Sequence, residues 1–393
     1  MRGLEVPEPT EDFTADPVEL FFDLAFVYAF SRLVWLLVHD PTWEGAGEAA
    51  MLFTVLWLVW STFTWAANAV QGNARPVRAI FLVATAASVP VGASVTTAFG
   101  SGGVTFAVGA SLIVGLGISL QLWGLSGDGV TAEEYRSVLR YGIPNIAAGT
   151  LLIIGSFVDG DARTVLWSLF ILAALAGVRD ARSGTWIVRP GHFAERHGLI
   201  LIVALGEVVV AIGLSVVESL EEADGLPGVT LVGLIAAGIL AGLLWWSYFD
   251  RVQPALEHHS TALEGNERSR FTADTYTGMH LLIVGGVIAL AAAVEEILLH
   301  PRDEVPTPFL VMFVGGVLLF YAGIAAAVAR SYRIVAVERL VTVLAVAAVA
   351  VIGSSWDGIV VLVVVDVIVA LGLMAEYVRI EQPSTTSTTT ADA

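Results

Sequence analysis

Apolar residues fill most of this chain in long runs that short polar stretches separate. Each run has about 16 to 25 residues, enough for a helix to cross a hydrocarbon core about 30 Å thick. The runs at 143–158 and 164–179 are the shortest, so ten spans are the alternative to about twelve. The pattern predicts an all-α polytopic membrane helical bundle with spans at 18–38, 47–70, 77–98, 103–125, 143–158, 164–179, 193–217, 229–250, 276–299, 306–329, 335–353 and 358–378.

The two ends of the chain differ from the apolar middle. Residues 1–17 are acidic and polar and lack the basic start of a cleavable signal peptide. Residues 380–393 form a low-complexity, Thr-rich tail, which we expect to be disordered. Between them we expect two membrane halves, 18–190 and 191–379, with about six spans each.

Arginines are distributed unevenly between the connections. The connections after even-numbered spans hold 12 arginines, and those after odd-numbered spans hold 2. Under the positive-inside rule, this predicts that both termini are cytoplasmic in a plasma-membrane protein with an even number of spans. The arginines of the even connections are Arg75, Arg78, Arg136, Arg140, Arg179, Arg182, Arg189, Arg251, Arg268, Arg270, Arg330 and Arg333, and those of the odd connections are Arg163 and Arg302.

A weak internal similarity relates the two halves. The second span contains Trp60-Ser-Thr-Phe63 and the eighth contains Trp246-Ser-Tyr-Phe249, while Glu19 and Glu195 stand near the starts of the first and seventh spans. The two offsets, 186 and 176 residues, differ and require an insertion or deletion. A parallel six-plus-six duplication and a coincidence of short motifs are both open interpretations.

Composition narrows the possible functions. Hydrophobic residues make up 56% of the 393 positions, charged residues 14%, and the mean hydropathy is +0.79, which is too apolar for an ordinary soluble domain. The chain has neither cysteine nor lysine, which excludes thiolate metal sites, Walker lysines and cofactors held as lysine Schiff bases. A net charge of −18 disfavours nucleic acid as a partner. We therefore expect no cofactor and no nucleic acid, with the lipid bilayer as the surroundings.

The first span carries two acids near its start. Glu19 and Asp23 are four residues apart and share one helix face. A charge inside a membrane is costly and indicates an ion path, a proton relay or a buried partner. For Glu19, a role in capping the first turn is an equal alternative. Arg32 lies on a different face, so we expect it to have its own acidic partner from another helix.

The seventh span is richer in polar residues. His192, Glu195 and Arg196 share a face, and Glu207 follows at mid-depth among apolar neighbours. A carboxyl group there should be either protonated, as in a proton carrier, or paired with a cation such as Arg32. With His197, the string resembles a zinc motif but matches neither H-E-x-x-H nor H-x-x-E-H, so we expect no metal. Asp366 in the twelfth span is a third intramembrane acid, for which helix packing and an ion pathway are both open.

Two segments resemble the low temperature requirement A (LtrA) family. Glu19-Leu-Phe-Phe-Asp-Leu-Ala-Phe-Val27 is similar to its signature E-L-F-F-D-L-V-F-V, and the stretch from His192 to Val209 is similar to H-x-x-E-R-[HF]-G-L-x-x-I-I-x-L-G-E-S. This sequence departs from the second signature at Val208, where a serine is usual. The resemblance implies a multi-pass membrane protein linked to growth in the cold, and it marks these family-defining positions: Glu19, Asp23, His192, Glu195, Arg196, His197, Gly206 and Glu207.

Two classes of function are compatible with the sequence. In the first, a transporter or channel, the intramembrane acids and arginines carry protons or bind a small ion or solute. In the second, a non-transport protein, the charges form buried structural pairs within an envelope or cold-adaptation scaffold or a lipid-acting enzyme. The sequence holds no nucleophile elbow or metal triad, so we expect no enzyme. We expect the acids of the first span to face those of the seventh near the cytoplasmic half of a central cavity.

Overall fold

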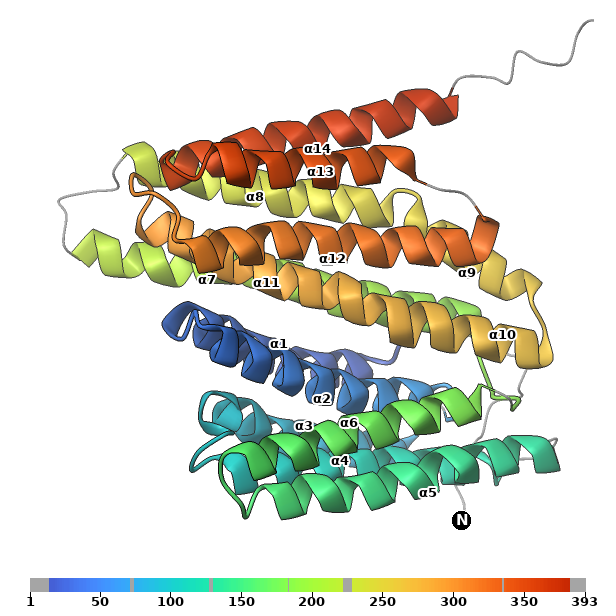
Figure 1. The fold of residues 1–393 in the computed structure, drawn as a ribbon. Helices are drawn as coiled ribbons and strands as arrows, with labels where there is room; N and C mark the ends of the chain where they lie inside the picture. Colours follow the sequence, from blue (N-terminus) through green and yellow to red (C-terminus); the bar gives the residue numbers. More distant parts are fainter. Residues whose placement is uncertain are drawn as a thin grey trace, which may run out of the picture.

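The computed structural model describes residues 14–70, 74–126, 130–182, 184–221, 228–333 and 336–381 (Figure 1). The regular structure within these ranges is helical. Its elements are α1 (Pro17–His39), α2 (Trp43–Ala67), α3 (Arg75–Ser94), the 3-10 turn η1 (Val95–Thr97), α4 (Gly103–Gly124), α5 (Ala132–Gly155), α6 (Asp161–Ala181), α7 (Pro190–Glu221), α8 (Gly228–Phe249), α9 (Val252–Ala262), α10 (Gly265–Thr272), the π-helix η2 (Ala273–Met279), α11 (His280–Leu299), α12 (Thr307–Tyr332), α13 (Val337–Ile352) and α14 (Gly358–Glu381).

Each of the twelve predicted spans coincides with a helix, which confirms the all-α polytopic bundle. Within the described ranges, ten helical segments are long and apolar enough to cross a membrane. The other two long helices are α7 and α13. The acidic tail and the Thr-rich tail that we predicted lie mostly outside the described residues.

The polar segment between the eighth and ninth spans is more ordered than the hydrophobic pattern indicated. It folds into α9 and α10, and α10 continues through η2 into α11. Helix α5 also begins well before the apolar run at 143, because Thr131 and Glu134 form a capping box. Hydrophobicity therefore located the spans but missed these polar helical turns.

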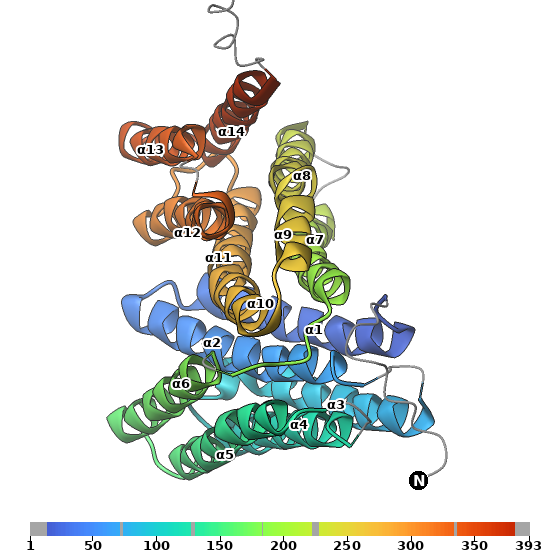
Figure 2. The ribbon, with the colours of Figure 1, turned by 90° about the vertical axis from the view of Figure 1, so that its right-hand side faces the viewer.

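The first and last groups of helices lie in different parts of the bundle (Figure 1). Helices α1 to α6, drawn in blue to green, lie together, and α7 to α14 lie on the other side of α1 and α2. Figure 2 shows the same division from the side. Helix α1 packs against both α7 and α11, and α2 also contacts α11. These four helices therefore form the junction between the two groups.

Local capping explains where α1 begins. Asp16 is its N-cap: Asp16 Oδ1 accepts a hydrogen bond from the backbone nitrogen of Val18 at 3.1 Å. Glu19 Oε1 accepts one from the backbone nitrogen of Asp16 at 3.2 Å. Pro17 occupies the first turn, where its missing N–H has no cost. The cap fixes the backbone from which Glu19 and Asp23 project.

Candidate functional site

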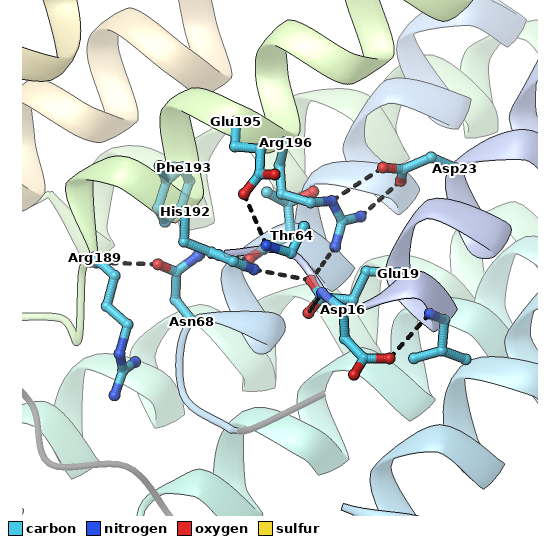
Figure 3. A network of polar contacts seen from close by, with 12 residues as sticks. Asp16, Glu19, Asp23, Thr64, Asn68, Arg189, His192, Phe193, Glu195 and Arg196 are labelled. Carbon is cyan, nitrogen blue, oxygen red and sulfur yellow. Dashed lines mark hydrogen bonds and ion pairs between the residues drawn. The ribbon is translucent and has the colours of Figure 1, made fainter. Parts of the chain in front are cut away.

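Four charged or titratable side chains converge where α1 meets α7 (Figure 3). Glu19 Oε2 accepts hydrogen bonds from His192 Nε2 at 2.9 Å and from Arg196 Nη1 at 2.5 Å. Arg196 also donates from Nε to Asp23 Oδ2 at 3.0 Å and from Nη2 to Asp23 Oδ1 at 2.6 Å. We call Glu19, Asp23, His192 and Arg196 the charge cluster. The predicted meeting of the first and seventh spans is confirmed for these residues.

The charge cluster is closed to solvent and lipid. Glu19, His192 and Arg196 are 0% exposed, and Asp23 is 2% exposed. Paired hydrogen bonds from one guanidinium to a carboxylate are strong and hold both groups in a fixed geometry. Trp60 of α2 adds a donor, because its indole Nε1 lies 2.7 Å from Asp23 Oδ1. The carboxylates are thus enclosed by protein, where we had expected them to line a central cavity.

Residues of α1 meet residues of α7 at a constant offset. Glu19 contacts His192 and Asp23 contacts Arg196, each 173 positions further along the chain. Pro17 and Pro190, which open the two helices, differ by the same number. The two helices therefore run in the same direction and in register. The acidic positions of α1 face the basic positions of α7, one turn after another.

Glu19 is both a cap and a member of the charge cluster. One carboxylate oxygen caps the first turn of α1, and the other contacts His192 and Arg196. The two alternatives set out from the sequence are thus combined in a single side chain. Glu195 points elsewhere: its Oε2 accepts a hydrogen bond from the backbone nitrogen of Ala15 at 2.7 Å. It lines an open cavity of about 480 Å³ together with Gln253 and Glu257.

Glu207 lies deeper along the same helix pair. Its side chain is 2% exposed and packs toward Ser31 of α1. Its Oε1 has no hydrogen-bond partner, and within the described ranges no ion pair includes Glu207. The predicted alternative of a salt bridge to Arg32 is therefore wrong. A buried carboxyl group without a cation is costly to ionise.

Arg32 and Asp366 lie outside the charge cluster. Arg32 Nη2 donates to Thr96 Oγ1 at 3.2 Å, and the guanidinium lies 4.9 Å from the ring centroid of Trp35. Our expectation of an acidic partner was wrong, because a hydroxyl group and an aromatic face receive the side chain. Asp366 of α14 lines a groove next to α8, and its Oδ1 has no hydrogen-bond partner. It faces α8 and not the junction of α1 with α7.

His197 occupies an aromatic enclosure beside the charge cluster. Its Nδ1 lies 2.9 Å from the carbonyl oxygen of Phe193, and its buried Nε2 has no hydrogen-bond partner. The rings of Trp60, Tyr276 and His280 have centroids 5.0, 5.0 and 5.1 Å from that of His197. Trp60 therefore touches both Asp23 and His197, and it links the charge cluster to this enclosure.

The sequence did not indicate the part played by η2 and α11. His280 Nε2 lies 2.6 Å from the hydroxyl oxygen of Tyr248, and its Nδ1 lies 2.9 Å from the carbonyl oxygen of Thr275. These contacts join α8 to the π-helix. A π-helix adds a residue to one turn and is frequent at functional sites. No hydrophobic periodicity could have revealed it.

Comparisons with known proteins identify the family of this chain. The family model of the bacterial low temperature requirement A protein (LtrA) matches residues 14–374, which include the charge cluster and almost all the described helices. This chain belongs to the LtrA family. A relative, an uncharacterized protein of Rhizobium meliloti (strain 1021), is 29% identical over 330 residues, which cover 80% of this chain and 77% of the relative. No solved structure matches the chain.

Family membership gives the charge cluster a context. All four of its residues lie within the region that matches the LtrA model. The two signature segments supply one helix each, α1 and α7, and the ion pairs described above join them. The two signature segments of this LtrA protein thus meet at the charge cluster.

Proposed function

We propose that this LtrA protein is a transporter or channel that moves protons, or a small ion or solute together with protons, along the junction of α1 and α7. The observation that carries the proposal is Glu207, a buried acid without a cation, which follows the charge cluster along the same helix pair. Intramembrane acids that face a bundle interior mark ion pathways by default.

The charge cluster supports this proposal because protonation can change its net charge. Arg196 is one fixed cation between two carboxylates, and His192 supplies a second positive charge only when it is protonated. A proton that arrives at His192 or at a carboxylate therefore changes the net charge at the junction. Because the junction joins the two groups of helices, such a change can alter their packing.

Glu207 is the second acid of the proposed pathway, after Asp23. From Asp23 to Ser31, α1 rises about 12 Å at roughly 1.5 Å per residue. The hydroxyl group of Ser31 lies beside Glu207, so the two acids are about that far apart along the bundle. A single side chain cannot cover this distance, so passage between them requires water or a helix movement.

The test is a flux measurement on purified protein in liposomes that contain a pH-sensitive dye. An imposed pH gradient or membrane potential should drive proton entry through the native chain. We expect Asp23→Asn and Glu207→Gln to reduce the rate at least tenfold, because each removes a titratable group from the pathway. Candidate ions and solutes are then screened in the same vesicles.

Glu376→Gln is the matched control. Glu376 pairs with Arg339 through two hydrogen bonds of 2.9 and 3.1 Å, but on α14, away from the junction. It should keep the native flux. If the native chain moves neither protons nor any screened solute, the charges have the structural role of the alternative class, a non-transport membrane protein. We also propose that the protein is not an enzyme.

The orientation in the membrane is part of the proposal. The arginine count supports a plasma-membrane protein with both termini in the cytoplasm. The charge cluster, at the start of α1, would then lie toward the cytoplasmic side. Protons from the outside would reach Glu207 before they reach Asp23.

A further inference from the structure

A groove runs along α8 and α14, far from the charge cluster. At one end it widens into a cavity of about 360 Å³, and farther along it forms a second cavity of about 350 Å³. Ala370 lines both cavities, so the two adjoin at this residue. From Asp250 to Val232, which line opposite ends, α8 rises about 27 Å at roughly 1.5 Å per residue.

The groove is polar at one end and apolar along the rest. Its polar end lies where α8 and α14 finish and holds Asp250, Arg251, Arg339 and Glu376. Farther along the two helices, the lining changes to Leu243, Leu373 and Met374, and then to Ile239, Ile235, Val232, Val367 and Val363. This order matches an amphiphile whose headgroup lies at the membrane surface.

The polar end carries balanced charges. Two carboxylates and two guanidinium groups line it, so its formal charge is zero. Arg339 and Glu376 pair with each other and are largely buried. Arg251 and Asp250 are more open, with side chains 37% and 38% exposed, and the Arg251 guanidinium lies 4.7 Å from the ring centroid of Tyr377. A ligand there would meet a cation and an anion side by side.

Trp246 and Tyr377 are residue types that favour the membrane–water interface. They line the polar end and are 56% and 46% exposed. Tryptophan and tyrosine favour the headgroup level of a membrane, because their rings are apolar and one atom of each is polar. The aromatic residues therefore place the polar end of the groove at the bilayer surface and the apolar remainder in the hydrocarbon.

We propose that the groove between α8 and α14 binds one phospholipid with a zwitterionic headgroup. The lipid phosphate pairs with Arg251, and the ammonium group pairs with Asp250. One acyl chain follows the apolar lining past Ala370 toward Val232. A leaflet is about 15 Å deep, half of the hydrocarbon core, so the groove is long enough for the chain. Asp366, the single acid of the deeper half, lines the groove beside the acyl chain.

The experiment uses the full chain, purified in detergent and freed of lipid. Phosphatidylethanolamine, phosphatidylcholine, anionic phosphatidylglycerol and soluble phosphoethanolamine are added separately. Native mass spectrometry then counts the lipids that stay bound, and the melting temperature is measured in parallel. We expect one zwitterionic lipid to be retained, with at least tenfold preference over phosphatidylglycerol, and no effect of soluble phosphoethanolamine.

Variants locate the site. Ala370→Trp blocks the point where the two cavities meet and should abolish retention. Ala326→Trp, which fills a groove between α12 and α13 that shares only Arg339 with the polar end, should not. If Ala370→Trp does not fold, Asp250→Asn combined with Arg251→Gln serves, because both side chains are partly exposed. Equal retention of zwitterionic and anionic lipids, or retention unaffected by these variants, would overturn the proposal.

Discussion

Two acids of the α1–α7 junction, Asp23 and Glu207, have opposite electrostatic surroundings. Asp23 receives hydrogen bonds from Arg196 and Trp60, whereas Glu207 has no cation within the described ranges. Removing one member of a buried ion pair leaves the other charge uncompensated, whereas neutralising an unpaired acid removes a group that is costly to bury. Stability measurements can therefore separate the two residues.

We predict that Asp23→Asn lowers the free energy of unfolding by about 3 kcal/mol, the usual loss when a buried pair is broken. Glu207→Gln should leave it unchanged or raise it. Both measurements are chemical unfolding of purified protein in the same detergent. The reason for the difference is Arg196, which keeps only Glu19 as a carboxylate partner once Asp23 is neutral.

The Trp60→Phe variant tests the hydrogen bond from the indole to Asp23. It keeps the aromatic contact with His197 but removes the indole donor to Asp23. A loss of about 1.5 kcal/mol is expected, the lower range for a hydrogen bond to a charged group.

Equal stability losses in Asp23→Asn and Glu207→Gln would contradict the assignment of Glu207 as an uncompensated acid.

The sequence predicted part of this site. Helical spacing placed Glu19 and Asp23 on one face of α1, and His192 and Arg196 on one face of α7. Their meeting therefore required only that α1 and α7 be neighbours. Arg32 was assigned the wrong partner, because an arginine can be satisfied by a hydroxyl group and an aromatic ring as well as by an acid. Trp60 was missed as an Asp23 partner, because tryptophans in a membrane chain usually belong to interfacial belts.

At the level of elements, α11 and α12 pass close to each other at two glycines. A Cβ added to Gly316 would lie 2.7 Å from the carbonyl oxygen of Gly286, and one added to Gly286 would lie 2.6 Å from the carbonyl oxygen of Gly316. Each glycine therefore faces the backbone of the other helix, which cannot move aside like a flexible side chain. Small residues at such crossings allow helices in membranes to pack closely.

Neighbouring glycines of α12 provide a matched test. Gly316→Ala should lower the free energy of unfolding by about 1–3 kcal/mol, the usual cost of overpacking. Gly315→Ala should raise it by up to about 1 kcal/mol, because nothing lies within 4 Å of the added Cβ and alanine favours the helix. Thermal and chemical unfolding of both variants measure the difference, and equal effects would show that the crossing is looser than described.

Element boundaries show where the sequence signal is weak. Apolar runs located twelve helices because a lipid-facing helix needs about twenty apolar residues in succession. The extra turns of α5, and α9 and α10, are polar and depend on capping and on packing against other helices. Ser269 of α10, for example, accepts a hydrogen bond from the backbone of Trp186 at 3.0 Å. Such contacts link segments distant in sequence and leave no periodic pattern.

The register of α1 with α7 bears on whether the two halves of the chain are a duplication. The contacting positions differ by 173 residues, whereas the sequence motifs suggested offsets of 186 and 176. Trp60 is 0% exposed and Trp246 is 56% exposed, so the two Trp-Ser-x-Phe motifs lie in unlike surroundings. In contrast, α3 packs against α1 as α11 packs against α7. This one correspondence is compatible with a parallel duplication, which stays a prediction.

At the scale of the whole molecule, the connections of odd and even spans gather at opposite ends. Arg163, in the connection after the fifth span, donates to the carbonyl oxygen of Ala98 at 2.9 Å and to that of Gly100 at 3.1 Å, in the connection after the third. At the other end, Asp274 pairs with Arg182 and Arg330, from the connections after spans six and ten. Arg163 is 3% exposed, so this odd-side arginine is a buried link between loops.

The absence of cysteine makes the membrane orientation directly testable. Ser126 follows α4 in an arginine-rich connection, and Ser354 lies between α13 and α14 in an arginine-poor one; both are exposed. Each hydroxyl group donates only to a backbone carbonyl three residues earlier, at 2.7 and 3.2 Å, so a single Ser→Cys change is equally mild at both sites. In intact cells, a membrane-impermeant maleimide should label Ser354→Cys and not Ser126→Cys, and both should react after permeabilisation. The reverse pattern would place the charge cluster at the outer face, and protons from the outside would then reach Asp23 before Glu207.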